Sequence, residues 1–391
     1  MVTMFRKFFL RIAFLFGFAS LASWMPMLNL WIEEKGLSGN IIGYLAAIPW
    51  LVMLFVQPLW GIIADKFGKL NCFRATCILA ALAFAVFPFI GAHSFSIAAI
   101  ILLMSLFYTP VLPLLDSIAL DQIEAGDSSY SNIRFWGAPG FGLGAYVAGL
   151  LIPKIGIDAI FYLSAIFLVL MFISLAGLKE LKSSSKSIDL EFRHIGKLFG
   201  TKMLPGFLFV IVIVATAQAS SSFYLTIYLK EIGANSQTTG TAIGIQALSE
   251  LPIYFIAPLL LKKLGSKNML LISIFATVLR LFLYSVNSYP ERVMFIETLN
   301  GITWALLWIA AVEFVNEAVP AQWRTTGQSL LWAAYFGAGS IAGNILSGRL
   351  YELMPMQKVF GINAVIVFGV GILATLIFVL ARKPELKMPP V

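Results

Sequence analysis

The stretch that decides the fold runs from Gly61 to Lys69 and reads GIIADKFGK. It overlaps the end of one apolar run, 41–64, and directly precedes a second, 70–91. About 20 apolar residues suffice for an α-helix to cross the hydrocarbon core of a bilayer. The stretch is therefore predicted to be a tight turn between two membrane-spanning helices.

The same alternation of long apolar runs and short polar turns continues along all 391 residues. Apolar residues make up 60% of the chain and charged residues only 12%, too few to cover the surface of a soluble protein of this size. We therefore expect an all-α membrane protein with twelve transmembrane helices. The predicted spans are 8–31, 41–64, 70–91, 94–118, 132–153, 157–178, 203–230, 239–261, 268–288, 291–316, 326–350 and 357–382.

Basic residues predict the orientation in the membrane. If the N-terminus is cytoplasmic, nineteen of the 27 Lys and Arg residues lie on the cytoplasmic side and six on the other. The basic start resembles the first part of a signal peptide, but its apolar run continues to about Trp31 without a cleavage site, which indicates a retained helix. The longest polar stretch, 179–202, predicts a cytoplasmic loop between two six-helix bundles, 1–178 and 203–391.

The two halves also share sequence features. Glycine-rich segments occur in the fifth and the eleventh span, where Gly140/Gly144 and Gly339/Gly343 form small-xxx-small pairs. Such pairs allow the backbones of two helices to approach closely. Parallel repeats of this kind are common in transporters, whose substrate site lies between the halves.

The turn at Gly61–Lys69 resembles the loop between the second and third helices of the major facilitator superfamily. Its matching residues are Gly61, Asp65, Lys66, Gly68 and Lys69. Gly61 is expected to permit close helix contact, Asp65 to accept hydrogen bonds at a helix end, and Gly68 to permit a sharp turn. The equivalent loop of the second half, 262–268, keeps the glycine and the basic character.

A narrower resemblance, to the lactose permease and phenylpropionate permease branch, covers nearly the whole chain. It rests on NIRFWG (132–137), SELP (249–252), AP (257–258) through GSKN (265–268), and SGRLYE (347–352). The resemblance implies that Asp116 and Arg134 flank the substrate, and it matches Glu250 and Arg280 to charged residues of the branch.

The resemblance also has departures. The helix 10 histidine and glutamate of lactose permease are replaced by Asn300 and Thr303, and its helix 11 lysine by Gly337. These departures argue against lactose as the substrate and against that proton relay. The SELP segment makes the phenylpropionate type the closer likeness.

Ionisable residues inside the spans are the strongest candidates for a functional site, because a charge at the centre of a membrane helix costs about 2.5–3.5 kcal/mol on insertion scales. Glu250, near the middle of the eighth span, is expected to carry a proton or bind substrate, with Arg280 as its counter-ion. Asp116 and Arg134 form either a coupling gate or a structural ion pair. Glu297 is a weaker proton-coupling candidate on a solvated face.

Two further sets of residues complete the candidate site. Glu313 and Glu317 are expected to pair with Arg324 as a structural clasp. Polar and aromatic candidates for lining the substrate cavity are Trp24, Tyr108, Trp136, Gln218, Tyr224, Gln246, Asn300, Trp304 and Tyr335.

Together these features predict a monomeric, proton-coupled symporter of a small organic solute in a bacterial-type inner membrane, with both termini cytoplasmic. An exporter or drug/proton antiporter, and a non-transporting solute sensor on the same scaffold, remain as alternatives. The sequence has no phosphate-binding loop, no Ser/His/Asp set and no metal-ligand spacing, so neither an enzyme, a cofactor nor a metal is expected. The basic residues lie in loops between apolar runs, which argues against nucleic acid as the partner of the +8 net charge and for the lipid bilayer.

Overall fold

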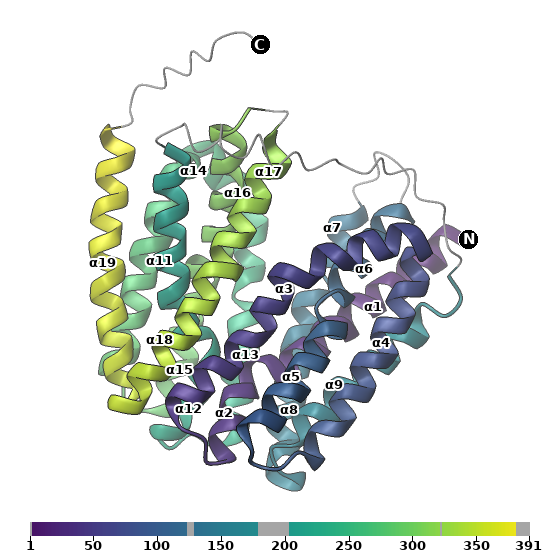
Figure 1. The fold of residues 1–391 in the computed structure, drawn as a ribbon. Helices are drawn as coiled ribbons and strands as arrows, with labels where there is room; N and C mark the ends of the chain where they lie inside the picture. The colour runs from purple at the N-terminus through teal and green to yellow at the C-terminus, as the bar shows by residue number, and fades with distance from the viewer. Residues whose placement is uncertain (1, 123–128, 179–202, 321–322, 381–391) are drawn as a thin grey trace.

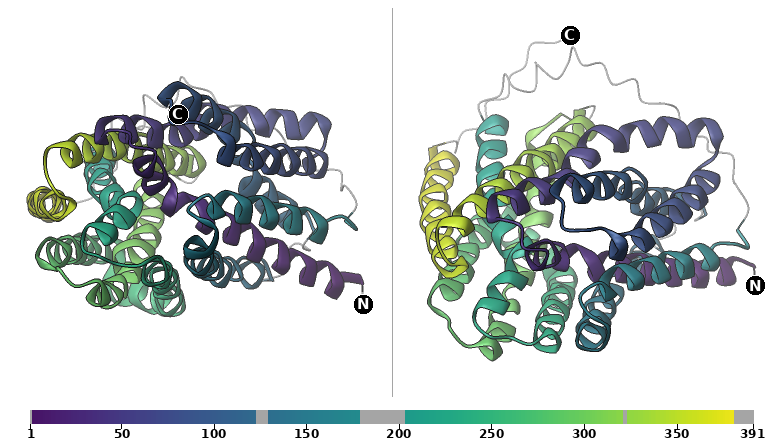
Figure 2. Two further views of the ribbon diagram at one scale, coloured as in Figure 1. Left: turned by 90° about the horizontal axis from the view of Figure 1, so that it is seen from below. Right: turned by 60° about the horizontal axis from the view of Figure 1, so that its bottom comes forward.

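The computed structural model describes residues 2–122, 129–178, 203–320 and 323–380. In these residues the regular structure is helical throughout. Figure 1 shows two helical bundles side by side, the first drawn in purple to blue and the second in teal to yellow. The further views in Figure 2 show the same separation into two groups of helices.

The first bundle is built from the helices that precede residue 179. α1 packs against α8 and α9, and α4 packs against α5, α6 and α9. The bounds of these helices are α1 Val2–Trp24, α2 Leu28–Glu34, α3 Gly39–Phe67, α4 Lys69–Val86, α5 Ser94–Tyr108, α6 Val111–Asp121, α7 Ser129–Arg134, α8 Gly137–Ile155 and α9 Ala159–Ser174.

The second bundle begins at residue 203. α11 packs against α18 and α19, and α14 packs against α16 and α19. The bounds of these helices are α11 Met203–Phe223, α12 Leu225–Glu231, α13 Ser236–Leu248, α14 Glu250–Val286, α15 Pro290–Glu297, α16 Leu307–Ala318, α17 Arg324–Trp332, α18 Ser340–Leu353 and α19 Met356–Leu380. Two π-helical segments, Gly301–Leu306 and Ala333–Gly339, complete it.

Ten segments of the described chain are long and apolar enough to cross a membrane. One of them, Ser236–Val286, is 51 residues long and contains Gly265 with a φ of 74°, so it is two helices joined by a turn. Ala159–Ser174 is a further, shorter apolar helix. The helices of the described residues are therefore consistent with the twelve spans that the sequence predicts.

Glycine makes the two short turns of the repeat possible. Gly68 ends α3 with a φ of 93°, and Gly265 occupies the equivalent turn of the second half. A positive φ is strained for residues with a Cβ atom, so glycine is favoured at both turns. The predicted sharp turn at Gly68 is confirmed.

Gly61 differs from the expectation. A Cβ atom on Gly61 would meet no atom of the described residues within 4 Å, so the expected close helix contact is absent there. Asp65 is exposed, and no described residue donates a hydrogen bond to it. The polar contact of this turn is made by Lys69, whose Nζ lies 2.7 Å from Oδ2 of Asp121 at the end of α6.

The glycine pairs confirm the predicted seams. A Cβ on Gly140 or Gly144 of α8 would lie 2.1 Å from the carbonyl oxygen of Leu15 or Ala19 of α1. In the second bundle, Gly339 and Gly343 meet α11 in the same manner. Each bundle therefore holds its first and fifth spans together through a glycine seam.

The two bundles touch at one end of the molecule. Gly39 and Gly43 of α3 cross α18 at Gly348 and Asn344, and Gly149 of α8 crosses Gly240 of α13. Beside these crossings, Nζ of Lys230 in α12 lies 2.5 Å from Oε2 of Glu33 in α2. α2 and α12 lie next to each other near the lower edge of Figure 1. We call this contact region the closed end.

Candidate functional site

The second bundle has a buried cluster of polar side chains around Arg280, which we call the Arg280 network. Arg280 of α14 is 4% exposed and lies opposite Glu297 at the end of α15. Its guanidinium Nη2 is 2.5 Å from Glu297 Oε2, and its Nε donates to the hydroxyl of Tyr284. Tyr284 in turn donates to the other oxygen of Glu297, at 2.5 Å. The charge of Arg280 is thus matched by an adjacent carboxylate.

This arrangement corrects two expectations. Glu297 was expected on a solvated face, but it is 0% exposed. Arg280 was expected to pair with Glu250, but it pairs with Glu297. α14 and α15 form an antiparallel hairpin, and this hairpin places residues 280 and 297 at facing positions.

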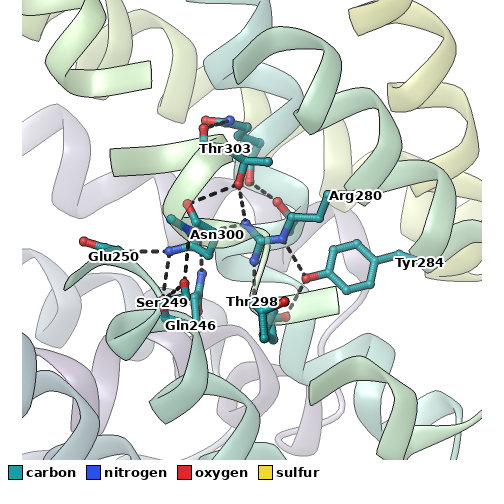
Figure 3. Close-up of polar contacts among 12 residues, drawn as sticks. Gln246, Ser249, Glu250, Arg280, Tyr284, Thr298, Asn300 and Thr303 are labelled. Carbon is teal, nitrogen blue, oxygen red and sulfur yellow. Dashed lines mark hydrogen bonds and ion pairs between the residues drawn. The ribbon is translucent and has the colours of Figure 1, made fainter. Parts of the chain in front are cut away.

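Glu250 belongs to the same network through an uncharged intermediary. Asn300 accepts a hydrogen bond from Nη1 of Arg280 at 2.6 Å, and its amide donates to Oε1 of Glu250 at 3.0 Å. The other oxygen of Glu250 accepts from the hydroxyl of Tyr254 at 3.1 Å. In Figure 3, Asn300 lies between Glu250 and Arg280. The described hydrogen-bond partners of Glu250 are therefore neutral.

Irregular helices bring these side chains together. α13 ends at Leu248 and α14 begins at Glu250, with only Ser249, itself in a helical backbone conformation, between them, so Glu250 lies near the middle of the predicted span, at a local irregularity. Ser249 at this break accepts a hydrogen bond from the backbone N–H of Gly301, where a π-helical segment begins. π-helical turns occur frequently at functional sites, because they reorient side chains within a helix.

Hydrogen bonds extend the network to α11 and to the second π-helical segment. Gln218 of α11 donates to Oγ1 of Thr277 at 2.9 Å and to the backbone carbonyl of Thr303 at 2.8 Å. It accepts from the hydroxyl of Tyr335 at 2.5 Å. Gln246 contacts Asn300, whose amide donates to its backbone carbonyl at 3.2 Å. Gln218, Gln246, Asn300 and Tyr335 thus lie in one network.

The first bundle contributes the pair of Asp116 and Arg134. Oδ1 of Asp116 in α6 accepts hydrogen bonds from the guanidinium of Arg134 in α7 and from the hydroxyl of Tyr130. The Arg134 side chain is 41% exposed. Next to Arg134, the ring of Phe135 lies 6.1 Å from the ring of Phe255 in α14 of the second bundle. This ring contact brings the segment that carries Arg134 next to the part of α14 that carries Glu250.

A cavity of about 670 Å³ lies between the bundles, on the side away from the closed end. Asp116, Asp65 and Lys69 are its charged lining residues among those described. Its walls come from α3, α6, α17 and the second π-helical segment, and include Trp50, Gln57, Ser117, Trp332 and Phe336. Trp50, Trp332 and Phe336 were not proposed as cavity residues from the sequence, because aromatic residues at helical spacing also occur at lipid-facing positions.

Aromatic side chains connect the cavity with the Arg280 network. Trp50 of the first bundle stacks on Phe336 of the second, with ring centroids 5.8 Å apart. Phe336 contacts Trp304, which in turn contacts Tyr335. These ring contacts therefore connect the Arg280 network to the cavity wall.

The other candidates lie elsewhere. Trp24 and Tyr108 pack against each other in the core of the first bundle, with ring centroids 5.4 Å apart. Tyr224 is buried and donates to the backbone carbonyl of Asn344, and Trp136 is 40% exposed. Trp24, Tyr108 and Tyr224 are therefore buried packing residues in this structure.

The expected clasp at Arg324 is also corrected. Glu317 accepts a hydrogen bond from Ser266 at 2.6 Å, and Arg324 donates to the backbone carbonyl of Asn316. Neither Glu313 nor Glu317 forms an ion pair with Arg324 in the described part of the chain.

Comparisons with known proteins agree with this architecture. Residues 8–362 match the model of the MFS_1 like family, so the chain belongs to that family. It is 24% identical over 360 residues to the maltose permease of Geobacillus stearothermophilus, a match that covers 92% of this chain and 90% of that protein. It is 21% identical over 359 residues to the probable 3-phenylpropionic acid transporter of Escherichia coli (strain K12), covering 89% and 92%.

The fold also matches solved structures. The crystal structure of the nucleoside transporter NupG superimposes with a TM-score of 0.85 and 20% sequence identity, covering 95% of this chain and 99% of that chain. The protein is therefore a multi-pass membrane transporter of the major facilitator type, and not an enzyme. The predicted family and fold class are confirmed.

Proposed function

We propose that this transporter is a proton-coupled symporter that takes up a small organic solute by alternating access. It acts as a monomer in a bacterial-type inner membrane, with both termini in the cytoplasm. Residues 1–178 and 203–391 form its two six-helix bundles, and residues 179–202, which lie outside the described part of the chain, form the cytoplasmic loop between them. The substrates named for its relatives give three candidate solute classes: sugars, nucleosides and aromatic acids.

The observation that carries this proposal is the environment of Glu250. An ionised carboxylate in a low-dielectric interior is costly unless it is paired with a cation. Arg280, the nearby cation of the network, already has Glu297 as its partner. Glu250, which is partly exposed, has only the amide of Asn300 and the hydroxyl of Tyr254 as hydrogen-bond partners among the described residues. Of the network's two carboxylates, Glu250 is therefore the one that is stabilised by taking up a proton.

Protonation of Glu250 would also change the hydrogen bonds of the rest of the network. Asn300 bonds both Glu250 and Arg280, so loss of the charge at Glu250 changes the partner of the same amide that orients Arg280. A bound proton thereby biases the packing of α14, α15 and the π-helical segments. An occupancy-dependent bias between two arrangements of the bundles is what alternating access requires.

The closed end and the cavity support an inward-open arrangement. With the α3–α4 turn in the cytoplasm, as its basic residues favour, the cavity opens to the cytoplasm and the closed end faces the outside. A symporter in this arrangement has released its solute and its proton.

A proteoliposome assay tests the proposal. With an inward-directed proton gradient, the native protein is expected to accumulate maltose, uridine or 3-phenylpropionate. Glu250→Gln keeps the hydrogen-bonding size of the side chain but does not titrate. We expect it to lose gradient-driven accumulation at least tenfold while it retains exchange of solute down a concentration gradient.

Glu313→Gln is the matched control, since Glu313 is a carboxylate of α16 outside the Arg280 network. It is expected to accumulate solute as the native protein does. Unchanged accumulation by Glu250→Gln would contradict the proposed role, and solute movement against the inward proton flux would identify an antiporter. Binding without flux would identify a sensor.

A further inference from the structure

The cavity lining contains two kinds of side chain. Trp50, Trp332 and Phe336 are aromatic, and the Trp50 and Phe336 rings stack with an interplanar angle of 13°. Asp116, Ser117 and Gln57 carry hydrogen-bonding groups. A cavity of about 670 Å³ is of the size that encloses one small organic molecule.

Two cations at the cavity have carboxylate partners. Arg134 is paired with Asp116, and Lys69 with Asp121. Deeper in the second bundle, Arg280 is paired with Glu297. Among the described residues that line the cavity, Lys69 is the only cation, whereas Asp65 and Asp116 are both acidic.

We propose that this cavity binds an uncharged ring solute that carries hydroxyl groups, such as a saccharide or a nucleoside, and that it rejects carboxylates. The apolar face of the ring lies on Trp50, Trp332 and Phe336, and the hydroxyl groups donate to Asp116. This inference rests on the proposed transport function and narrows its solute classes from three to two.

The physical reason is the pairing of charges. A hydroxyl that donates to an ionised carboxylate forms a strong hydrogen bond, and the flat face of a ring buries apolar area on aromatic side chains. A carboxylate solute would instead lose its hydration beside two acidic side chains. It would have to compete with Asp116 for Arg134, so the site discriminates against it by repulsion.

The test measures binding to the purified full-length protein in detergent, without a proton gradient. Maltose, glucose, uridine and adenosine are the neutral probes, and 3-phenylpropionate is the carboxylate probe. We expect thermal shift and calorimetry to detect at least one neutral probe and no binding of 3-phenylpropionate.

Asp116→Asn sharpens the test. This change leaves the half-exposed Arg134 without its counter-ion at the cavity, so it is expected to weaken the neutral probe at least tenfold and to gain 3-phenylpropionate binding. Asp65→Asn is the matched control. It removes an acidic side chain of the same cavity but uncovers no guanidinium, so its gain in 3-phenylpropionate binding is expected to be much smaller than that of Asp116→Asn.

Trp332→Ala provides a second variant, because Trp332 is 43% exposed and its removal leaves the buried core intact. It is expected to weaken the neutral probe without creating affinity for the carboxylate.

Binding of 3-phenylpropionate by the native protein, or the absence of binding by all four neutral probes, would overturn the inference. A gain of carboxylate binding by Asp65→Asn equal to that of Asp116→Asn would also overturn it. These readouts need no flux, so a failure of proton-coupled transport is seen separately in the proteoliposome assay.

Discussion

Arg280 and Glu297 form an ion pair that is almost completely enclosed by the second bundle. Tyr284, Asn300 and Thr303 bond the remaining donors and acceptors of the pair. At the residue scale, this pair fixes the local charge balance, and it leaves Glu250 as the carboxylate of the network without a cation. The role proposed for Glu250 thus depends on the pairing of Arg280 with Glu297.

Removing one charge of the pair leaves the other charge buried without a partner, which is energetically costly. Glu297→Gln leaves the guanidinium of Arg280 buried without a counter-ion, and breaking a buried pair in this manner costs about 3–5 kcal/mol. We expect a large drop in the melting temperature of the purified protein.

Glu291→Gln in the same helix is the control, because Glu291 is exposed. It should leave the melting temperature unchanged. The double variant Glu297→Leu with Arg280→Met removes both charges and is expected to recover much of the lost stability. A melting temperature of Glu297→Gln equal to that of the native protein would show that Arg280 is not held by this carboxylate.

At the scale of elements, glycine seams and helix irregularities position the network. The Gly140/Gly144 seam holds α8 on α1, and Gly339/Gly343 holds the second π-helical segment and α18 on α11. Gly301 also approaches the break between α13 and α14, since its Cβ would lie 2.2 Å from the carbonyl oxygen of Ser249. Close backbone contact thus brings Asn300 within reach of Glu250.

Adding a methyl group to one glycine of α8 tests the seam. A Cβ on Gly144 would lie 2.1 Å from the carbonyl oxygen of Ala19, so Gly144→Ala must push α1 and α8 apart. Such overpacking costs about 1–3 kcal/mol. We expect a lower melting temperature for Gly144→Ala.

Gly142→Ala is the control two residues away, where the nearest described atom would lie 3.8 Å from the added Cβ. It should melt as the native protein does. Equal melting temperatures for both variants would contradict the close approach of α1 and α8.

At the scale of the whole molecule, the two bundles are held together at the closed end and are separated by the cavity at the other. α3 and α18 meet there through Gly39 and Gly348, and the backbone N–H of Asn40 donates to Glu352 across the interface at 2.9 Å. Small residues at the crossing allow the two helices to pack tightly. Opening this end requires that the helices separate and that the Lys230–Glu33 ion pair and the Asn40–Glu352 hydrogen bond break.

A bulky residue at the crossing should shift the balance toward the outward-open arrangement. A Cβ on Gly348 would lie 2.4 Å from the carbonyl oxygen of Gly39, so Gly348→Leu cannot be accommodated at the closed end. Spin labels at positions 38 and 353 are expected to report a longer distance in this variant, in a background without Cys72 and Cys77.

Gly369→Leu in α19 is the control, because a Cβ there would meet no described atom within 4 Å. It should leave the label distance unchanged. An unchanged distance in Gly348→Leu would show that this crossing does not hold the closed end shut.

Apolar runs of sufficient length and the placement of glycine were enough to predict the all-helical membrane fold, the glycine seams and the turn at Gly68. These features are predictable because they follow from local requirements: a helix must satisfy its own backbone in lipid, and a positive φ favours glycine. The sequence also identified most members of the Arg280 network. Charged and polar side chains inside apolar spans are energetically costly, so their presence indicates a pair or a functional site.

The sequence could not decide which charges pair. By residue type, either Glu250 or Glu297 could pair with Arg280. The packing of α14 against α15 and the π-helical segment pairs Arg280 with Glu297 and places Asn300 between Arg280 and Glu250. The cavity wall of Trp50, Trp332 and Phe336 likewise unites residues that are far apart in the sequence. Local chemistry thus determined the elements, whereas side-chain pairing between distant spans depended on the tertiary structure, because it is a property of facing surfaces and not of either segment alone.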